Sequence, residues 1–151
     1  MHLQSLWRDE RITILDLDCL TPSTVHGDLR HRTKVMPTLK SQGLHYPLLC
    51  TKFTPNEYQI RVVQGTNKQS ASRLLPARIN SDGLIWVVKM GCNRYQAALE
   101  LGYTQIDCIF FDNTDDCVKM ARWFEQCNPL FNTSCEPYQG DRKSTRLNSS
   151  H

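Results

Sequence analysis

The chain has 151 residues, which is enough for one domain and not comfortably enough for two. Its 40% hydrophobic and 22% charged residues are typical of a globular protein, and a net charge of +3 is small for a protein that mainly coats nucleic acid. No stretch approaches the roughly 18 uninterrupted apolar residues of a membrane helix, and charged residues occupy positions 8–11, where a signal peptide would be apolar. These features predict a cytoplasmic protein without a membrane segment.

Seven cysteines are spread along the chain. None forms a Cys-x-x-Cys pair, and no histidine stands at zinc-ligand spacing from a cysteine pair, so we expect no structural metal. In a cytoplasmic protein, an odd number of cysteines is interpreted as reduced thiols rather than disulfides.

The last eleven residues, 141–151, look like the in-frame translation of a common sequencing adapter. They hold three of the 18 basic residues and one of the 15 acidic residues, so the rest of the chain has 15 basic and 14 acidic residues and a net charge of +1. We therefore expect residues 1–140 to form a single domain and 141–151 to be an artefactual, disordered tail. The reading frame is also expected to be truncated, with the natural protein continuing past Gly140.

The first half of the chain contains several short predicted elements. Alternating apolar residues predict a strand over 12–20, which Pro22 ends. A polar stretch over 25–34 predicts a solvated loop. A helix over 38–43 follows, with Pro37 in its first turn and a glycine at its end, and a buried strand is expected over 45–51.

The middle of the chain has weaker patterns. Residues 58–63 have the composition and alternation of a strand, and 64–75 are interpreted as a turn with a short helix. A strong turn signal at 80–83 precedes a second strand over 84–89. The strands 58–63 and 84–89 are expected to form a hairpin.

The most regular pattern begins at residue 86. It predicts a strand over 86–90, a turn at 91–93, a helix over 94–101 and a returning strand over 106–111. A further helix is expected over 115–126, with its start signalled by short polar residues. Together these elements predict a small α+β fold with a mixed sheet and helices packed on it.

The turn Gly91-Cys92-Asn93-Arg94 between a strand and a helix carries the clearest chemical signal. A helix N-terminus presents unpaired N–H groups and a partial positive charge, which attract phosphate. Glycine lets the backbone turn sharply and approach a ligand, and the planar guanidinium of Arg94 matches phosphate oxygens. The residues therefore predict a phosphate-binding turn, with a purely structural turn as the alternative.

Residues 87–110 resemble the ParB/sulfiredoxin superfamily. Its members carry a strand, a Gly-x-x-Arg turn, a helix with paired alanines, a glycine and a second strand, which are matched here by Ala97, Ala98 and Gly102. Residues 38–49 are similar to the first box of the family, in which a helix containing Ser or Thr ends in glycine and leads through proline into a strand. The resemblance spans 12 to about 125 and is interrupted by an insertion at about 52–85.

This resemblance implies a ParB-like nucleotide-binding domain of bacterial or phage origin. In the family, the Gly-x-x-Arg turn holds nucleotide phosphates, those of CTP in chromosome-partition ParB proteins and of ATP in sulfiredoxins. The role carries over to Gly91, Cys92, Asn93 and Arg94, and Thr38 falls where members place a hydroxyl near the nucleotide. The implied ligand is a nucleoside triphosphate, CTP or ATP, with Mg²⁺; its hydrolysis is left open.

Two alternatives stay open. The sulfiredoxin turn has the pattern Gly-Cys-His-Arg, so Cys92 could be a nucleophile that attacks a phosphorylated sulfinate of a peroxiredoxin, although Asn93 replaces the histidine. The alternative interpretation is that Cys92 is only a small turn residue, whose backbone N–H matters rather than its sulfur. The second alternative is a truncated ParB-like DNA-binding or nuclease protein. Residues 123–129 match the second phosphate motif of the family poorly, and the sequence shows no helix-turn-helix pattern. This alternative would therefore need a missing C-terminal domain to bind DNA.

Overall fold

The computed structural model describes residues 1–25, 31–65 and 74–126. One mixed sheet forms its centre, with strands in the order β1-β6-β4-β5-β3 and β2 also paired with β6. The strand bounds are β1 His2–Leu3, β2 Thr13–Asp16, β3 Leu20–Pro22, β4 Leu48–Phe53, β5 Ile85–Met90 and β6 Gln105–Phe111. β4 runs antiparallel to β5 and parallel to β6, and β3 runs parallel to β5.

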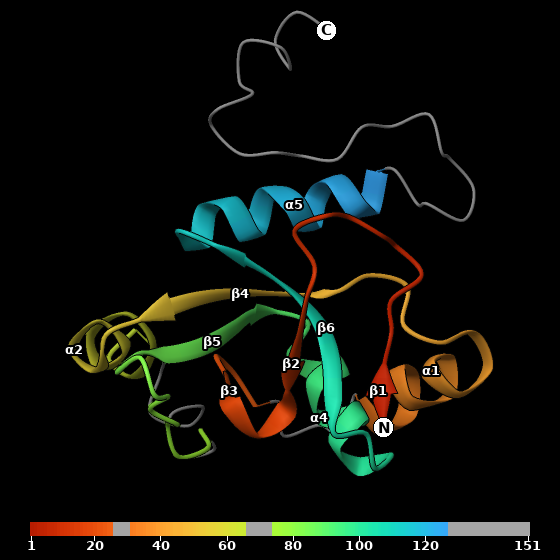
Figure 1. Ribbon diagram of the computed structural model, residues 1–151, viewed down its shortest axis with the longest axis horizontal. Coiled ribbons are helices and arrows are strands. Elements are labelled where there is room, and N and C mark those ends of the chain that lie inside the picture. The colour runs from red at the N-terminus through yellow and green to blue at the C-terminus, as the bar shows by residue number, and fades with distance from the viewer. Residues whose placement is uncertain (26–30, 66–73, 127–151) are drawn as a thin grey trace, which may run out of the picture.

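Helices pack on both faces of this sheet, which confirms the predicted α+β class. Their bounds are α1 Met36–Gln42, α2 Pro55–Tyr58, α4 Cys92–Glu100 and α5 Thr114–Gln126, with short helical turns η1 Leu17–Cys19, η2 His31–Val35 and η3 Gln59–Val63. α5 lies along one face of the sheet, while α4 and α1 lie on the other side (Figure 1).

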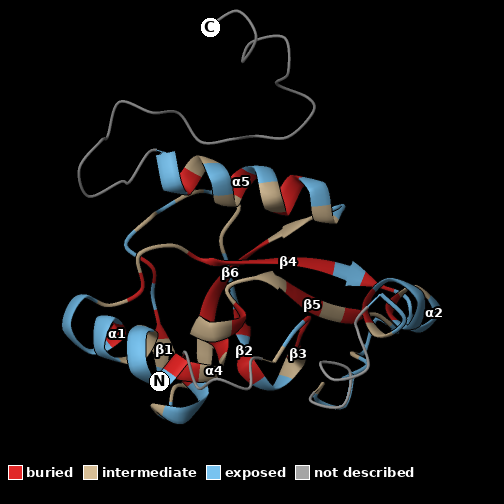
Figure 2. Ribbon diagram, turned by 180° about the vertical axis from the view of Figure 1, so that it is seen from behind, coloured by how far each residue is buried: buried red, intermediate tan, exposed pale blue. Residues whose placement is uncertain are grey.

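The alternation of side chains along β4 explains the two layers. Leu48 and Cys50 belong to the cluster that packs against Ala97 and Ala98 of α4. Leu49, between them, belongs to the cluster beneath α5, with Ile109, Cys117, Met120 and Phe124. Figure 2 shows the buried residues concentrated in the strands and on the inner sides of the helices.

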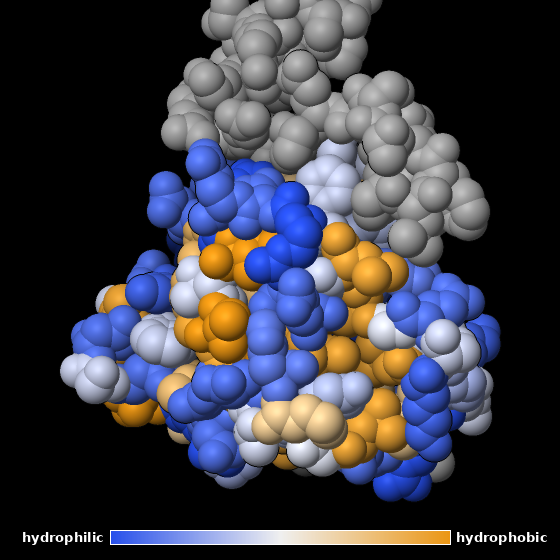
Figure 3. Space-filling model, turned by 45° about the vertical axis from the view of Figure 1, so that its right-hand side comes forward, coloured by the Kyte–Doolittle hydropathy of each residue, from blue (hydrophilic) through white to orange (hydrophobic). Residues whose placement is uncertain are grey.

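Hydrophobic side chains that remain largely exposed are scattered. On the face shown in Figure 3, hydrophobic and hydrophilic side chains are interspersed. The most exposed large ones are Met1, Ile79, Ile60, Ile14 and Leu6. Within the described ranges, no helix is long and apolar enough to cross a membrane.

Several predicted elements are confirmed. α1 has Pro37 in its first turn and ends at Gly43, whose φ is 80°. β5, α4 and β6 follow one another at the predicted positions, and α5 begins one residue before the predicted start. The predicted turn at 80–83 is present, with Gly83 at φ 79°.

The strand and hairpin predicted for 58–63 are wrong, because this segment is helical, over α2 and η3. Thr54 and Glu57 form a capping box: the Thr54 hydroxyl accepts from the Glu57 N–H at 3.1 Å, and the Glu57 carboxylate accepts from the Thr54 N–H at 2.9 Å. Pro55 occupies the first turn, where a proline is tolerated. Tyr58 and Val62, four residues apart, then pack on Ile85 and other residues of the sheet.

Two further predictions need correction. The single strand predicted over 12–20 is broken into β2, η1 and β3, because the chain crosses from β6 at one side of the sheet to β5 at the other. The solvated loop predicted over 25–34 contains the helical turn η2, and His31 in it is 4% exposed. Positions 26–30 and 66–73 lie outside the described residues, as does the predicted tail at 141–151.

Candidate functional site

The turn between β5 and α4 depends on Gly91. Its φ of 104° and ψ of 23° are left-handed, a conformation that residues with a Cβ resist. A Cβ at this position would also lie 2.6 Å from Cδ2 of Leu48 in the neighbouring strand β4. The backbone conformation therefore favours glycine, and a Cβ would in addition force the end of the buried Leu48 side chain to move.

The first turn of α4 leaves its backbone donors free. The Gly91 carbonyl accepts from the N–H of Tyr95 at 2.9 Å, which closes the first helical hydrogen bond. No side chain caps the helix, and the N–H groups of Cys92, Asn93 and Arg94 donate to no other described residue. Free N–H groups at a helix N-terminus carry partial positive charge, so this turn can accept an anion.

Arg94 adds a full positive charge to the same turn. The side chain is half-buried, and in the described ranges it forms no ion pair or hydrogen bond. Burial lowers the pKa of Arg94, because the charged form loses hydration, and the nearby Tyr46 opposes this shift. A partly desolvated cation without a carboxylate partner is the natural counterpart of an anionic ligand.

A cavity of about 310 Å³ opens at this turn, and we call it the turn cavity. It brings together the four predicted turn residues with four others, and its lining is Thr24, Val35, Lys89, Met90, Gly91, Cys92, Asn93 and Arg94. The side-chain oxygen of Asn93 is buried and accepts no hydrogen bond from a described residue. Thr38 is not part of this lining: it lies exposed on α1, and its hydroxyl donates to the Lys34 carbonyl at 3.1 Å.

A second cavity of about 130 Å³ adjoins the first, and we call it the aromatic cavity. It shares Met90, Gly91 and Arg94 with the turn cavity and is completed by Tyr46, Pro47, Leu49, Ala121, Phe124 and Glu125. The rings of Tyr46 and Phe124 stack at 4.2 Å, and the Tyr46 hydroxyl donates to the Phe124 carbonyl at 3.0 Å. Sequence reasoning missed this cavity and Lys89; the only local signal was the aromatic residues beside Pro47 and at the end of α5.

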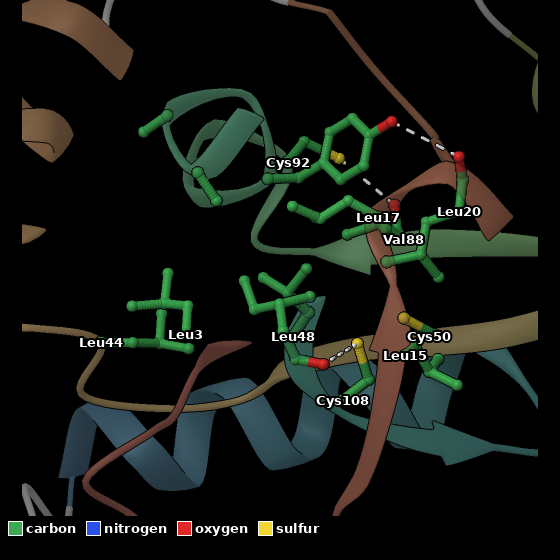
Figure 4. Close-up of a cluster of buried hydrophobic side chains, with 14 of the residues drawn as sticks. Leu3, Leu15, Leu17, Leu20, Leu44, Leu48, Cys50, Val88, Cys92 and Cys108 are labelled. Carbon is green, nitrogen blue, oxygen red and sulfur yellow. Dashed lines mark hydrogen bonds between the residues drawn. The ribbon is translucent and has the colours of Figure 1, made fainter. Parts of the chain in front are cut away.

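The thiol of Cys92 is directed into the protein. Cys92 is 7% exposed, and its Sγ donates to the Val88 carbonyl at 3.2 Å and lies 3.5 Å from the Ser23 hydroxyl. Figure 4 shows the sulfur among the buried side chains of the α4 layer. In this arrangement the sulfur contributes to packing, while the backbone N–H of Cys92 remains one of the free donors of the first turn.

Metal ligands are sparse at the turn. The described residues contain no group of three or more His, Cys, Asp and Glu side chains that could hold a metal ion. The described lining of the turn cavity has no carboxylate; its side-chain oxygens are those of Thr24 and Asn93, and Glu125 lines the aromatic cavity. The donors present fit phosphate oxygens better than they fit a bare cation.

Comparison with known proteins finds distant similarity among solved structures. No protein-family model matches the sequence, and no curated protein matches it. Among solved structures, the chain is similar to sulfiredoxin from Arabidopsis thaliana, with 18% sequence identity and a TM-score of 0.36, over 72% of this chain and 92% of that chain. Membership of this chain in the ParB/sulfiredoxin superfamily stays a prediction from the sequence.

Proposed function

We propose that this chain binds the phosphate groups of a nucleoside triphosphate at the turn from Gly91 to Arg94, as a ParB-like nucleotide-binding domain. One observation carries the proposal. Three free backbone N–H groups and an unpaired, half-buried guanidinium meet at one cavity, with no carboxylate among the described residues that line it. This combination of donors and charge favours an anion over a neutral or cationic ligand.

The two adjoining cavities suggest how the nucleotide would lie. Phosphate groups would occupy the turn cavity, where the N–H groups of residues 92–94 donate to their oxygens and Arg94 binds two oxygens at once. The nucleoside would extend past Arg94 toward the aromatic cavity, because the two cavities share Met90, Gly91 and Arg94. Together they provide the apolar walls and few polar groups that are typical of small-molecule sites.

CTP and ATP, each with Mg²⁺, are the nucleotides that the sequence resemblance implies. Bound Mg²⁺ would neutralise part of the phosphate charge, and the Asn93 side-chain oxygen, which lacks a hydrogen-bond donor, could accept from one of its water ligands. The proposal covers binding and not hydrolysis.

Calorimetric titration of the full chain with ATP, CTP, GTP and UTP in the presence of Mg²⁺ tests this proposal. Hydrogen bonds to charged groups contribute about 1.5–3 kcal/mol, so Arg94→Ala should weaken binding by about 10- to 100-fold. Arg122→Ala removes an exposed arginine of α5 outside both cavities and should leave affinity unchanged. Equal affinity of the wild type and Arg94→Ala, with both folded by circular dichroism, would show that the site is wrongly assigned.

The second candidate is sulfiredoxin-like chemistry, because Cys92 lines the turn cavity beside Arg94. The inward thiol described above would have to rotate out before it could attack a substrate. The test is reduction of a peroxiredoxin sulfinate with ATP, Mg²⁺ and an external thiol. Turnover that Cys92→Ser abolishes would support this candidate, whereas the main proposal expects no turnover and unchanged nucleotide affinity in Cys92→Ser. DNA binding through a further domain stays a prediction.

A further inference from the structure

Lys89 is a second basic residue among those that line the turn cavity. It is the penultimate residue of β5, it lines the cavity, and it is half-buried. Its ammonium lies 5.9 Å from the centroid of the Phe53 ring, and none of the ion pairs formed between described residues includes it. A half-buried lysine without a carboxylate partner carries a desolvation cost that an anionic ligand would offset.

The groups around Lys89 do not neutralise it. Burial lowers the pKa of Lys89, and the positive charge of Arg61 lowers it further, while the Cys92 and Cys117 thiols act in the opposite direction. A thiol is uncharged near neutral pH unless it is activated, so it supplies little counter-charge there. With Arg94, the described lining of the turn cavity thus includes two basic residues from different elements, one on β5 and one on α4.

We propose that Lys89 is a further anion-binding residue that sets how many phosphate groups the ligand carries: at least two linked groups, rather than one. The inference rests on the proposed function. Three N–H groups and Arg94 already provide enough donors for a single phosphate group, so a second cation on the β5 side would be redundant for a monophosphate. A lysine is suited to this role, because its flexible stem can bring a compact charge to a neighbouring phosphate.

The test uses inorganic orthophosphate, pyrophosphate and triphosphate as probes of the full chain, which removes any contribution from a nucleoside. Lys89→Met should weaken triphosphate binding about tenfold and orthophosphate binding less than twofold. Lys89→Arg keeps the charge and should retain most of the triphosphate affinity. Lys119→Met, which removes an exposed lysine of α5, is the matched control and should change nothing.

Proton uptake provides a readout that a purely structural role would not change. The pKa of Lys89 is lowered in the free protein, and a bound polyanion would raise it, so binding near the lowered pKa takes up protons. Calorimetry of triphosphate binding in buffers of different ionisation enthalpy measures this uptake. The proton uptake that comes from Lys89 should be present in the wild type and absent from Lys89→Met and Lys89→Arg.

The outcomes separate this inference from the function on which it rests. If Lys89→Met weakens orthophosphate and triphosphate equally, or changes neither, the role of Lys89 is refuted, while loss of all three probes in Arg94→Ala still supports the phosphate site. If the wild type binds none of the probes, both proposals fail. If Lys89→Met is poorly folded, equal proton uptake by the wild type and Lys89→Arg would refute the role of Lys89.

Discussion

Two helices of this protein follow strands of the same sheet, yet their N-termini are built differently. α2 follows β4, and its own side chains close its start: Thr54 and Glu57 satisfy each other's backbone N–H groups within the capping box. α4 follows β5 and has only Gly91 at its start, without any side-chain cap. The start of α2 thus has side chains that accept from its backbone N–H groups, whereas no side chain accepts from those at the start of α4.

The difference shows how two similar local structures can serve different purposes. A capped helix start contributes stability and has fewer donors left for a ligand, because its own side chains accept from some of them. An uncapped start beside an unpaired arginine lacks that stability, and the proposed function assigns its free donors to an anion. Changes at the two helix starts should therefore affect different measured quantities.

Gly91→Ala should have the largest effect. A left-handed alanine costs about 1–3 kcal/mol in strain, and the contact with Leu48 adds an overpacking cost of similar size, so we expect a loss of about 3 kcal/mol in the free energy of unfolding. Urea denaturation measures this change, and phosphate binding should be lost with it.

Gly102→Ala is the control: φ is also positive, at 88°, but nothing lies within 4 Å of the added Cβ. Its cost should be about 1 kcal/mol. Equal losses in the two variants would contradict the role given to the Leu48 contact.

Thr54→Ala should have a smaller effect, confined to stability. Loss of an N-cap hydroxyl costs about 1 kcal/mol, measured by urea denaturation, and triphosphate affinity should not change. A drop in affinity for triphosphate would mean that the start of α2 influences binding at the start of α4, which would contradict the separate roles of the two helix starts.

Glu100→Gln concerns the opposite end of α4 and should produce the smallest effect. The hydrogen bonds from Arg32 and His31 lower the pKa of Glu100 from 4.5 to about 2. A carboxylate whose pKa is lower in the folded state contributes stability above its unfolded pKa, and this contribution is lost as the pH falls toward 2. The difference in unfolding free energy between wild type and Glu100→Gln should therefore be constant above pH 4.5 and shrink below it. A difference that stays constant down to pH 2 would rule out the ion pair as its source.

The sequence predicted the β5–α4–β6 unit correctly because its signals are local. Alternation in the strands, a glycine at each end of the helix and the pair Ala97–Ala98 all lie within about one turn of the structure that they specify. The β-branched composition of 58–63 wrongly predicts a strand, because the helix there begins upstream of the segment. The capping box at Thr54 and Glu57, which precedes it in the chain, is the local signal that indicates this helix start.

The candidate site was only partly predictable, because only some of its residues are neighbours in the sequence. Gly91, Cys92, Asn93 and Arg94 are contiguous, so any strand-to-helix turn places them together. The aromatic cavity depends on Tyr46 and Phe124, which are 78 positions apart and meet only through packing of α5 on β4. Thr38 was included by resemblance alone, and it lies outside both cavities.

Chemical shifts of backbone amides test the central claim most directly. In ¹⁵N–¹H spectra of the full chain titrated with triphosphate and Mg²⁺, the resonances of Cys92, Asn93 and Arg94 should shift strongly and saturate together. Those of Asn56 and Glu57 in the capped start of α2 should hardly move. If the α4 amides stay in place while triphosphate binds, or shift no more than those of α2, the open helix start is not where this protein binds phosphate.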